Sequence, residues 1–243
     1  MKKGFTLTEV LLALAIIGVV AAITIPAFYN SYGNKVASAQ LKKVCTLITN
    51  AARHIITDEN TKDLSSLNSD YDANTLIIEA QNEEDEDLEY ILGFYTTSAG
   101  VKTSNAEKGA QFFLTKYFKH TSLGCGAGDC LADEYLNSNG TSVGAVPASF
   151  YCIKSQNNAA ICMRFKEGIN RTQVLVDVNG SDRPNITGSD VFVMFITDDG
   201  DLKDLDENPE NCNQRSANDD EDILRYAAGC FHKILGSSWN MNN

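Results

Sequence analysis

The N-terminal part of the chain carries two different hydrophobic patterns. The apolar run from Val10 to Ile25 is uncharged, and residues 5–27 form a helix of about 34 Å, enough to cross the hydrocarbon core of a membrane. After Pro26, apolar residues recur on one helix face, at Leu41, Cys45, Ile48, Ala52 and Ile55. We predict one long helix with a kink at Pro26, apolar all round in residues 5–27 and amphipathic in residues 28–57.

A row of β-branched and aromatic segments follows in the C-terminal part, separated by short polar turns. The segments are Phe150–Lys154, Ala159–Phe165, Thr172–Val178 and Val191–Thr197. Short connections join neighbouring antiparallel strands, so we predict an antiparallel meander within residues 150–243. Cys152 and Cys162 are equidistant from Asn157, which places them opposite each other across a hairpin and within disulfide range.

The stretch between these two parts, residues 58–149, shows little regular patterning. Its beginning, Asp58–Asp87, is rich in Asp, Asn, Glu and Ser, and we interpret it as a variable surface connection. Within residues 106–118, apolar side chains recur at helical spacing and predict a short helix. These side chains are Ala110, Phe113, Leu114 and Tyr117. The predicted fold class is α+β, with the long N-terminal helix packed on an antiparallel β-sheet head.

The residues before the apolar run indicate how the chain is processed. Lys2 and Lys3 are followed by Gly4 and then by Phe5-Thr6-Leu7-Thr8-Glu9, and the small-residue site at which a secretory signal is cut is missing. This segment resembles the prepilin-type leader of the type IV pilin and type II secretion pseudopilin superfamily, over roughly the first 55 residues. The resemblance implies a leader of residues 1–4, cleavage between Gly4 and Phe5, and N-methylation of Phe5 by a prepilin peptidase.

Glu9 is the one charged side chain in residues 5–27. An isolated carboxylate in hydrocarbon costs several kcal/mol, so its position indicates a function and requires a cationic partner. Cleavage would give Phe5 a free α-amine, and we predict that Glu9 of one subunit pairs with this amine of its neighbour. Glu9 and Pro26 are therefore the predicted assembly residues. The alternative is a plain signal anchor in which Glu9 has no role.

The lysines before the apolar run predict the topology. By the positive-inside rule they keep the N-terminus in the cytoplasm and send the rest of the chain across the membrane. The resemblance implies a single-pass protein of the bacterial inner membrane that later enters a periplasmic or extracellular filament. The expected partners are other pilin or pseudopilin subunits, the prepilin peptidase, the inner-membrane assembly platform and the membrane itself.

Seven cysteines in an exported chain predict disulfides. The preferred pairs are Cys125 with Cys130, Cys152 with Cys162, and Cys212 with Cys230. The last pair would close a C-terminal loop, as in many pilins. Six cysteines admit other connectivities as well, so this pairing is a preference. Cys45 remains on the apolar helix face, either as a buried thiol or bonded to a cysteine of the head.

Oxygen-bearing side chains gather around one predicted turn, and calcium is a candidate ligand for them. The set is Asp177, Asn179, Asp182 and Asp190. Some major pseudopilins carry calcium, but their motif is not recognisable here and the closing Glu of a full calcium loop is missing. We favour the alternative, a hairpin turn at Asn179-Gly180 whose Asp and Asn side chains bond local amides. We expect no other cofactor.

The net charge and one short motif limit the classes of function that fit the chain. The chain has 20 basic and 32 acidic residues, and loss of Lys2 and Lys3 with the leader lowers the net charge from −12 to −14. So acidic a surface repels phosphate backbones, and we expect no nucleic-acid partner. The stretch 140–144 has the G-x-S-x-G spelling of a hydrolase nucleophile elbow around Ser142, but a polar run precedes it and Pro147 follows. We therefore predict a flexible loop there, and no enzyme.

Two interpretations of the function remain. The first is a structural subunit of a type IV pilus or a type II secretion filament, minor or specialised because nearly 190 residues follow Ile55. The second is a filament-associated adhesin or substrate-binding minor pilin, whose head contacts a surface or an export substrate. We favour the first. The pilus and the secretion filament share the predicted anchor, so both stay open.

Overall fold

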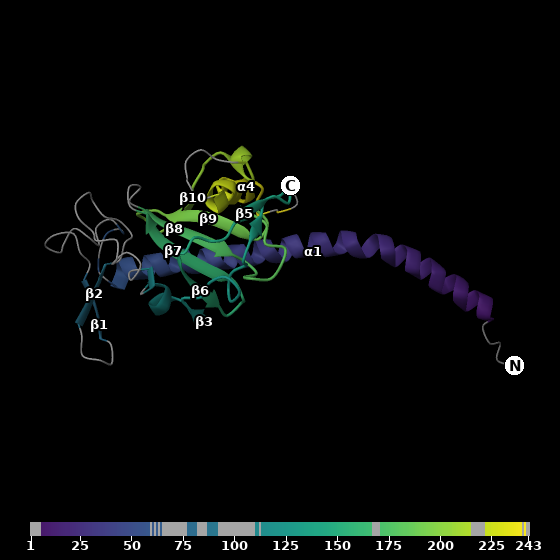
Figure 1. The fold of residues 1–243 in the computed structure, drawn as a ribbon, viewed down its shortest axis with the longest axis horizontal. Helices are drawn as coiled ribbons and strands as arrows, with labels where there is room; N and C mark the ends of the chain where they lie inside the picture. Colours follow the sequence, from purple (N-terminus) through teal and green to yellow (C-terminus); the bar gives the residue numbers. More distant parts are fainter. Residues whose placement is uncertain are drawn as a thin grey trace.

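The computed structural model describes most of the helix and most of the head. The described residues are 6–58, 60, 62, 64, 77–81, 87–91, 110–111, 113–166, 171–214, 222–239 and 241, of which 25–32, 77–81, 87–91, 165–166, 171 and 222 are described by their backbone alone. Figure 1 shows a long helix, α1, that lies against a β-sheet head and extends far beyond it.

Helix α1 runs from Leu7 to Asp58 without interruption, which confirms the predicted continuation of the helix past Pro26. Figure 1 shows that the part beyond the head bends away from the axis of the part beneath the head. The predicted apolar face is confirmed, because all five of its side chains are buried. They are Leu41, Cys45, Ile48, Ala52 and Ile55.

The head is built on a six-stranded antiparallel sheet of order β10-β9-β8-β7-β6-β3. Its four central strands form the predicted meander, each within one residue of the expected bounds. They are β6 (Tyr151–Ser155), β7 (Ala160–Lys166), β8 (Arg171–Asp177) and β9 (Val191–Ile196). The hairpin register places Cys152 opposite Cys162, as the sequence predicted.

Further strands lie outside the predicted meander. The sheet gains the edge strands β3 (His120–Leu123) and β10 (Leu202–Asp204), and two small hairpins form from β1 (Ile77–Gln81) with β2 (Asp87–Ile91) and from β4 (Tyr135–Leu136) with β5 (Ser142–Gly144). The predicted connecting region, residues 58–149, thus contains strands, and residues 142–144 form a strand where we predicted a flexible loop. The segments of β3, β4, β5 and β10 are too short to show a periodic pattern, and β1 and β2 contain Asp, Glu and Ala residues, which are depleted in strands.

The predicted short helix before β3 is confirmed for the residues that the structure describes. Residues 110–111 and 113–117 are helical. Phe113 and Leu114 are fully buried, and Phe113 stacks at an angle on Tyr117 with ring centres 5.3 Å apart. Residues 106–109 and 112 of the predicted helix lie outside the described residues.

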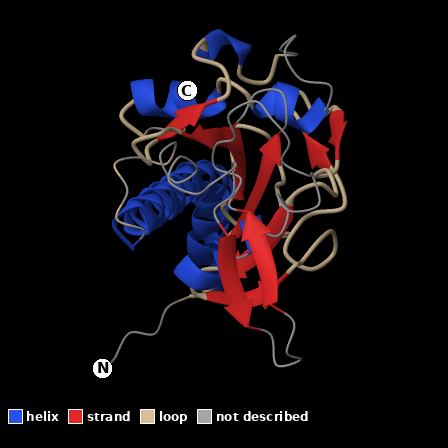
Figure 2. Cartoon of the chain, turned by 90° about the vertical axis from the view of Figure 1, so that its left-hand side faces the viewer, coloured by secondary structure: helices blue, strands red, loops and turns tan. Residues whose placement is uncertain are grey.

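The sheet separates two clusters of buried side chains. One cluster joins α1 and the helix at 113–117 to sheet residues such as Ile161, Val174 and Phe192. The other cluster joins Leu175 and Val193 to the loop 125–143 and to helix α3 (Asp222–Ala227). These two residues directly follow Val174 and Phe192 in sequence and therefore face the opposite side of the sheet. Figure 2 shows α1 lying to one side of the strands. Because side chains alternate between the faces, the strands hold α1 on one face and a layer of loops on the other.

The C-terminal segment returns to the helix. After the short 3₁₀ turn η2 (Pro209–Asn211), α4 (Cys230–Gly236) is capped by the Asp204 carboxylate, which accepts the backbone N–H groups of Gly229 and His232, both at 2.7 Å. The Ser38 hydroxyl then donates to the Trp239 carbonyl. The end of the chain is thereby tied to α1 near the point where the helix leaves the head.

Candidate assembly segment and head groove

The first half of α1 lies outside the head. Leu7–Thr24 is long and apolar enough to cross a membrane, and none of it is buried against the rest of the structure. Leu7 is 78% exposed and Ile23 is 72% exposed. A helix that is apolar on all sides is normally buried, in a core or in a membrane. This segment therefore needs an apolar environment that comes from outside its own chain.

Glu9 caps the beginning of α1. Its Oε2 accepts hydrogen bonds from the backbone N–H and the hydroxyl of Thr6, both at 2.8 Å, while the Glu9 N–H donates to Thr6 Oγ1 at 3.3 Å. This reciprocal arrangement is a capping box, which satisfies donors that have no partner within a helix. The prediction of a cationic partner for Glu9 did not include this role, although the T-x-x-E spacing of Thr6 and Glu9 indicates it. The carboxylate is thus fixed at the end of α1.

The other predicted processing and assembly residues are less fully placed. Gly4 and Phe5 lie outside the described residues. Pro26 lies within α1, in the stretch described by its backbone alone. Cleavage between Gly4 and Phe5, and methylation of Phe5, stay predictions.

Cations on the second half of α1 contact the head. Arg53 forms an ion pair with Asp201 at 2.7 Å, and Lys43 Nζ donates to Asn157 Oδ1 at 3.1 Å. Lys42 Nζ lies 5.7 Å from the centre of the Trp239 ring. These exposed side chains flank the buried face, so they add contacts between the helix and loops on either side of it.

The seven cysteines form three disulfides and one free thiol. The bonded pairs are Cys125–Cys130, Cys152–Cys162 and Cys212–Cys230, the same pairs that the sequence favoured. Cys45 is the buried thiol, which agrees with the first of its two interpretations. Burial raises the pKa of its thiol to about 12. Cys45 therefore stays protonated and acts as a small core side chain.

The four candidate calcium ligands occupy different environments. Asp177 and Asp190 are buried, whereas Asp182 is exposed. Asn179 Nδ2 donates to the carbonyls of Asp182 and Arg183, at 2.6 and 3.2 Å, and Asp177 Oδ1 accepts the Asn179 N–H at 3.3 Å. Side-chain bonds to the local backbone are therefore present, but the predicted hairpin turn at Asn179-Gly180 is wrong, because β8 ends at Asp177 and β9 begins only at Val191. In the described part of the chain, no group of three or more Asp, Glu, His or Cys side chains comes together as metal ligands do. Calcium binding stays a prediction.

The two buried carboxyls are bonded to their surroundings. Asp177 Oδ2 accepts from the Tyr135 hydroxyl at 2.7 Å, and both oxygens of Asp190 accept backbone N–H groups at 2.6 Å, from Asn185 and Ile186. Burial raises the pKa of Asp177 to about 8 and that of Asp190 to about 6. Burial also raises the pKa of Tyr135, with the charge of Asp177 as the next cause. These acids therefore hold protons more tightly than exposed ones do.

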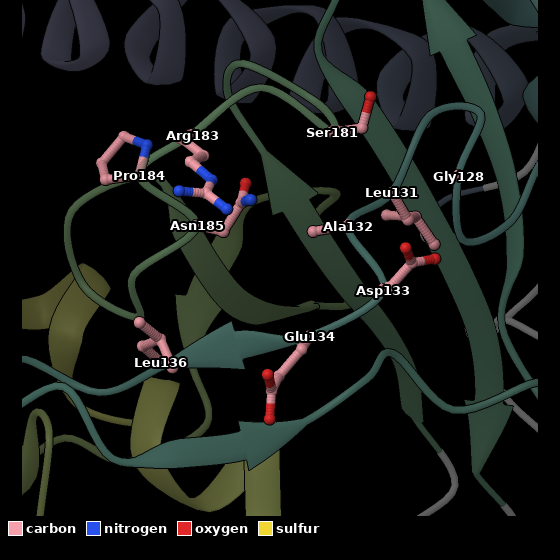
Figure 3. Close-up of a pocket in the computed structure, with 10 residues that line it drawn as sticks. All are labelled: Gly128, Leu131, Ala132, Asp133, Glu134, Leu136, Ser181, Arg183, Pro184 and Asn185. Carbon is pink, nitrogen blue, oxygen red and sulfur yellow. The ribbon is translucent and has the colours of Figure 1, made fainter.

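A groove of about 560 Å³ opens between the loops 128–136 and 181–185. Figure 3 shows Asp133 and Glu134 on one side of it and Arg183 with Asn185 on the other, with Leu131 and Ala132 from the first loop. The two loops are far apart in sequence, so no local pattern predicted this groove. The composition of each loop alone resembles an ordinary polar turn.

The buried acids hold both walls of the groove. The Ala132 N–H donates to the Tyr135 hydroxyl at 3.1 Å, and this hydroxyl in turn donates to Asp177, which fixes the first wall. Asp190 fixes the second wall through the N–H of Asn185. The Leu136 N–H donates to the Asn185 carbonyl at 2.9 Å and joins the walls. The groove is therefore built by a connected set of buried hydrogen bonds.

The serine motif does not form a nucleophile elbow. Ser142 begins β5, which pairs with β4, and residues 145–149 after it contain no helix. Its hydroxyl accepts only a long bond of 3.4 Å, from the Gly144 N–H. The strand, sharp turn and helix that expose such a nucleophile are not present at this position.

Comparisons with known proteins bear on the N-terminal segment. Searches of curated proteins and of solved structures gave no match. Residues 1–25 match the family model described as the prokaryotic N-terminal methylation motif, the leader signature of type IV pilins and pseudopilins.

Proposed function

We propose that this protein is a structural subunit, minor or specialised, of a type IV pilus or a type II secretion filament, cleaved after Gly4 and assembled through α1. The methylation motif supports a pilin or pseudopilin subunit in general. It implies processing by a prepilin peptidase and assembly with other such subunits. The observation that carries the proposal is the first half of α1, which is apolar on all sides and uncovered.

Two environments would cover this half-helix in turn. Lipid of the bacterial inner membrane surrounds it in the stored subunit, with the N-terminus in the cytoplasm and the head on the far side. In the filament the same surface packs on the helices of neighbouring subunits, brought there by the inner-membrane assembly platform. Each large apolar side chain gains on the order of 1.5–3 kcal/mol when it is removed from water, in either environment.

The capping box supports a register function for Glu9. Its carboxylate is held at the end of α1 by Thr6, next in sequence to Phe5, whose amine becomes free upon cleavage. We propose that this carboxylate meets the amine of a neighbouring Phe5. Such a pair neutralises two charges that would otherwise lie unpaired among apolar helices.

The processing step is tested by intact mass measurement and N-terminal sequencing of the membrane-associated protein. The expected chain begins at Phe5, and a strain without prepilin peptidase should yield the uncut chain. A chain that begins at Met1 in both strains, or that is cut beyond Ala22, would contradict the proposal.

The role of Glu9 is tested by two variants with different chemistry. Glu9→Gln keeps an oxygen that can accept from Thr6, but it removes the charge. Glu9→Ala removes both the accepting oxygen and the charge. If the charge sets register, both variants are cleaved normally and both enter filaments at least about tenfold less than the wild type. Normal incorporation of Glu9→Gln would show that capping, and not pairing, is the role of Glu9.

A filament-associated adhesin or substrate-binding minor pilin is the second candidate function, and the groove in the head favours it. The two candidates differ in what loss of the protein changes. Loss of a structural subunit lowers the number of filaments, whereas loss of an adhesin or substrate-binding subunit leaves filaments that no longer bind their target. Counting filaments in a deletion strain and measuring their binding separates the two candidates.

A further inference from the structure

Opposite charges face each other across the groove without touching. Arg183 lies on one wall, and Asp133 and Glu134 lie on the other (Figure 3). All three residues are exposed. Among the described residues, the two ion pairs, Arg53–Asp201 and Lys116–Asp58, involve neither wall of the groove. The walls therefore present one cation and two carboxylates whose charges are not used within the head.

Four apolar residues join the charged ones in the lining of the groove. Leu131 is 4% exposed and Ala132 is 7% exposed, and Leu136 and Pro184 complete the apolar part of the lining. Among the residues that the structure describes, the lining contains no aromatic ring on which a sugar or a base would stack. A volume of about 560 Å³ lies within the range of small-ligand sites, so a short segment of chain fits it.

These charges define the chemistry of a ligand. A guanidinium binds a carboxylate with two parallel hydrogen bonds. Asp133 and Glu134 would repel a ligand with several negative charges, such as a polyphosphate or a sulfated glycan, and would attract an ammonium or guanidinium group. A ligand that pairs with the charges on both walls carries one carboxylate and one basic group, joined by a narrow chain that fits between the walls. A polypeptide with an acidic and a basic side chain has this composition.

The groove belongs to the face of the head that lies away from α1. Leu131, Ala132 and Tyr135 pack in the cluster on the side of the sheet opposite to the buried face of α1. In a filament whose core is made of α1 helices, this face points outward. The occupant then comes from outside the filament, and this step rests on the proposed function.

We propose that the groove binds an extended polypeptide segment of a protein other than this subunit, through one carboxylate at Arg183 and one basic group at Asp133 and Glu134. The walls are already hydrogen-bonded to the buried carboxyls, so binding requires little ordering of the head. Because the charges are exposed, recognition is expected to be salt-sensitive.

The test uses the full mature chain in detergent micelles and short, end-blocked fluorescent peptides. In these peptides a lysine and an aspartate are separated by glycine spacers of increasing length. Fluorescence anisotropy should show binding at one or two spacer lengths. Peptides in which the lysine is replaced by norleucine, or the aspartate by asparagine, should bind about tenfold more weakly.

Matched variants assign the binding to the groove. Arg183→Gln should weaken binding about tenfold, and so should the double variant Asp133→Asn with Glu134→Gln. Lys203→Gln removes one positive charge, and the double variant Asp198→Asn with Asp199→Asn removes two negative charges, at exposed positions outside the lining. Both control variants should bind like the wild type. Unfolding of each variant, followed by Trp239 fluorescence, shows whether the head is intact.

Two results would overturn the inference. One is the absence of binding to any peptide of the series, or binding that the groove variants leave unchanged. The other is binding of an acidic oligosaccharide with no binding of the peptides. Both results are obtained on the unassembled chain, so they are distinct from a failure of cleavage or of filament incorporation, which would contradict the proposed function instead.

Discussion

The two halves of α1 are continuous in backbone but opposite in how they are covered. In the second half, Leu41, Ile48 and Ile55 are fully buried against the sheet. In the first half, Leu12 is 64% exposed and Ile17 is 62% exposed. The halves differ in composition, because the second half carries Lys35, Lys42, Lys43 and Arg53, whereas Glu9 is the one charged residue of the first. They also differ in the arrangement of apolar side chains around the helix. A one-sided stripe can be covered by one sheet, whereas an all-round surface needs several partners.

One helix therefore has two kinds of surroundings. The second half belongs to the folding of the head, and its apolar face is buried within the chain. The first half is uncovered in the chain, and we propose that lipid or the helices of other subunits cover it. Substitutions in the two halves should therefore separate stability from assembly.

Truncation of a core side chain should have the largest effect on stability. Ile48→Ala removes a fully buried side chain, and we expect the free energy of unfolding of the head to fall by about 2–5 kcal/mol. Leu12→Ala, in the exposed half, should leave this free energy unchanged. Denaturant unfolding of the full chain in micelles, followed by the fluorescence of the single tryptophan, Trp239, measures both. Equal losses in the two variants would show that the halves are not independent.

The stability of the head should also depend on pH. Burial raises the pKa of Asp177 to about 8 and that of Asp190 to about 6, so the folded head holds protons that the unfolded chain releases above about pH 4. The resulting stability is fully present below about pH 4 and is lost as pH rises through about 6 and then 8. The free energy of unfolding should fall with pH by at most about 1.4 kcal/mol per pH unit for each carboxyl.

A single variant checks the source of this pH dependence. Asp177→Asn keeps an oxygen for the Tyr135 hydroxyl but no longer titrates, so the slope between about pH 6 and pH 8 should flatten. Leu12→Ala should keep the full slope. A wild-type head that becomes more stable as pH rises across this range would contradict the raised pKa values.

The surface contacts of α1 should have the smallest effect. Arg53 and Asp201 form an ion pair at 2.7 Å, but their side chains are 58% and 55% exposed. We expect Arg53→Gln to lower the free energy of unfolding by about 0.2–1 kcal/mol, and high salt to remove the difference. A loss as large as that of Ile48→Ala would mean that ion pairs, and not the buried face, hold the helix on the sheet.

Much of the fold could be predicted because its signals are local or periodic. The apolar face through Leu41 and Ile55 follows from helical spacing, and β6 to β9 follow from runs of β-branched and aromatic residues. The pairing of Cys152 with Cys162 follows from the symmetry of one hairpin. The edge strands β3 and β10 were missed, because three or four residues carry no periodic signal and pair only where a neighbour is available.

Part of the candidate site could also be predicted. Gly4, Phe5 and Glu9 are recognisable from their order before an apolar run, and the match of residues 1–25 agrees with this interpretation. The capping of Glu9 by Thr6 was missed, although its spacing is local. The groove lies beyond any local pattern, because Asp133 and Arg183 come together only through the bonds of Asp177 and Asp190.

By itself, the sequence determined the long helix, its two hydrophobic patterns and the processing signal, because each depends on neighbours within a few positions. The burial of Asp177 and Asp190, the edge strands of the sheet and the groove between two distant loops became visible only in the tertiary structure. These features depend on contacts between residues far apart in the chain, and burial changes the free energy of charged groups only after those contacts form.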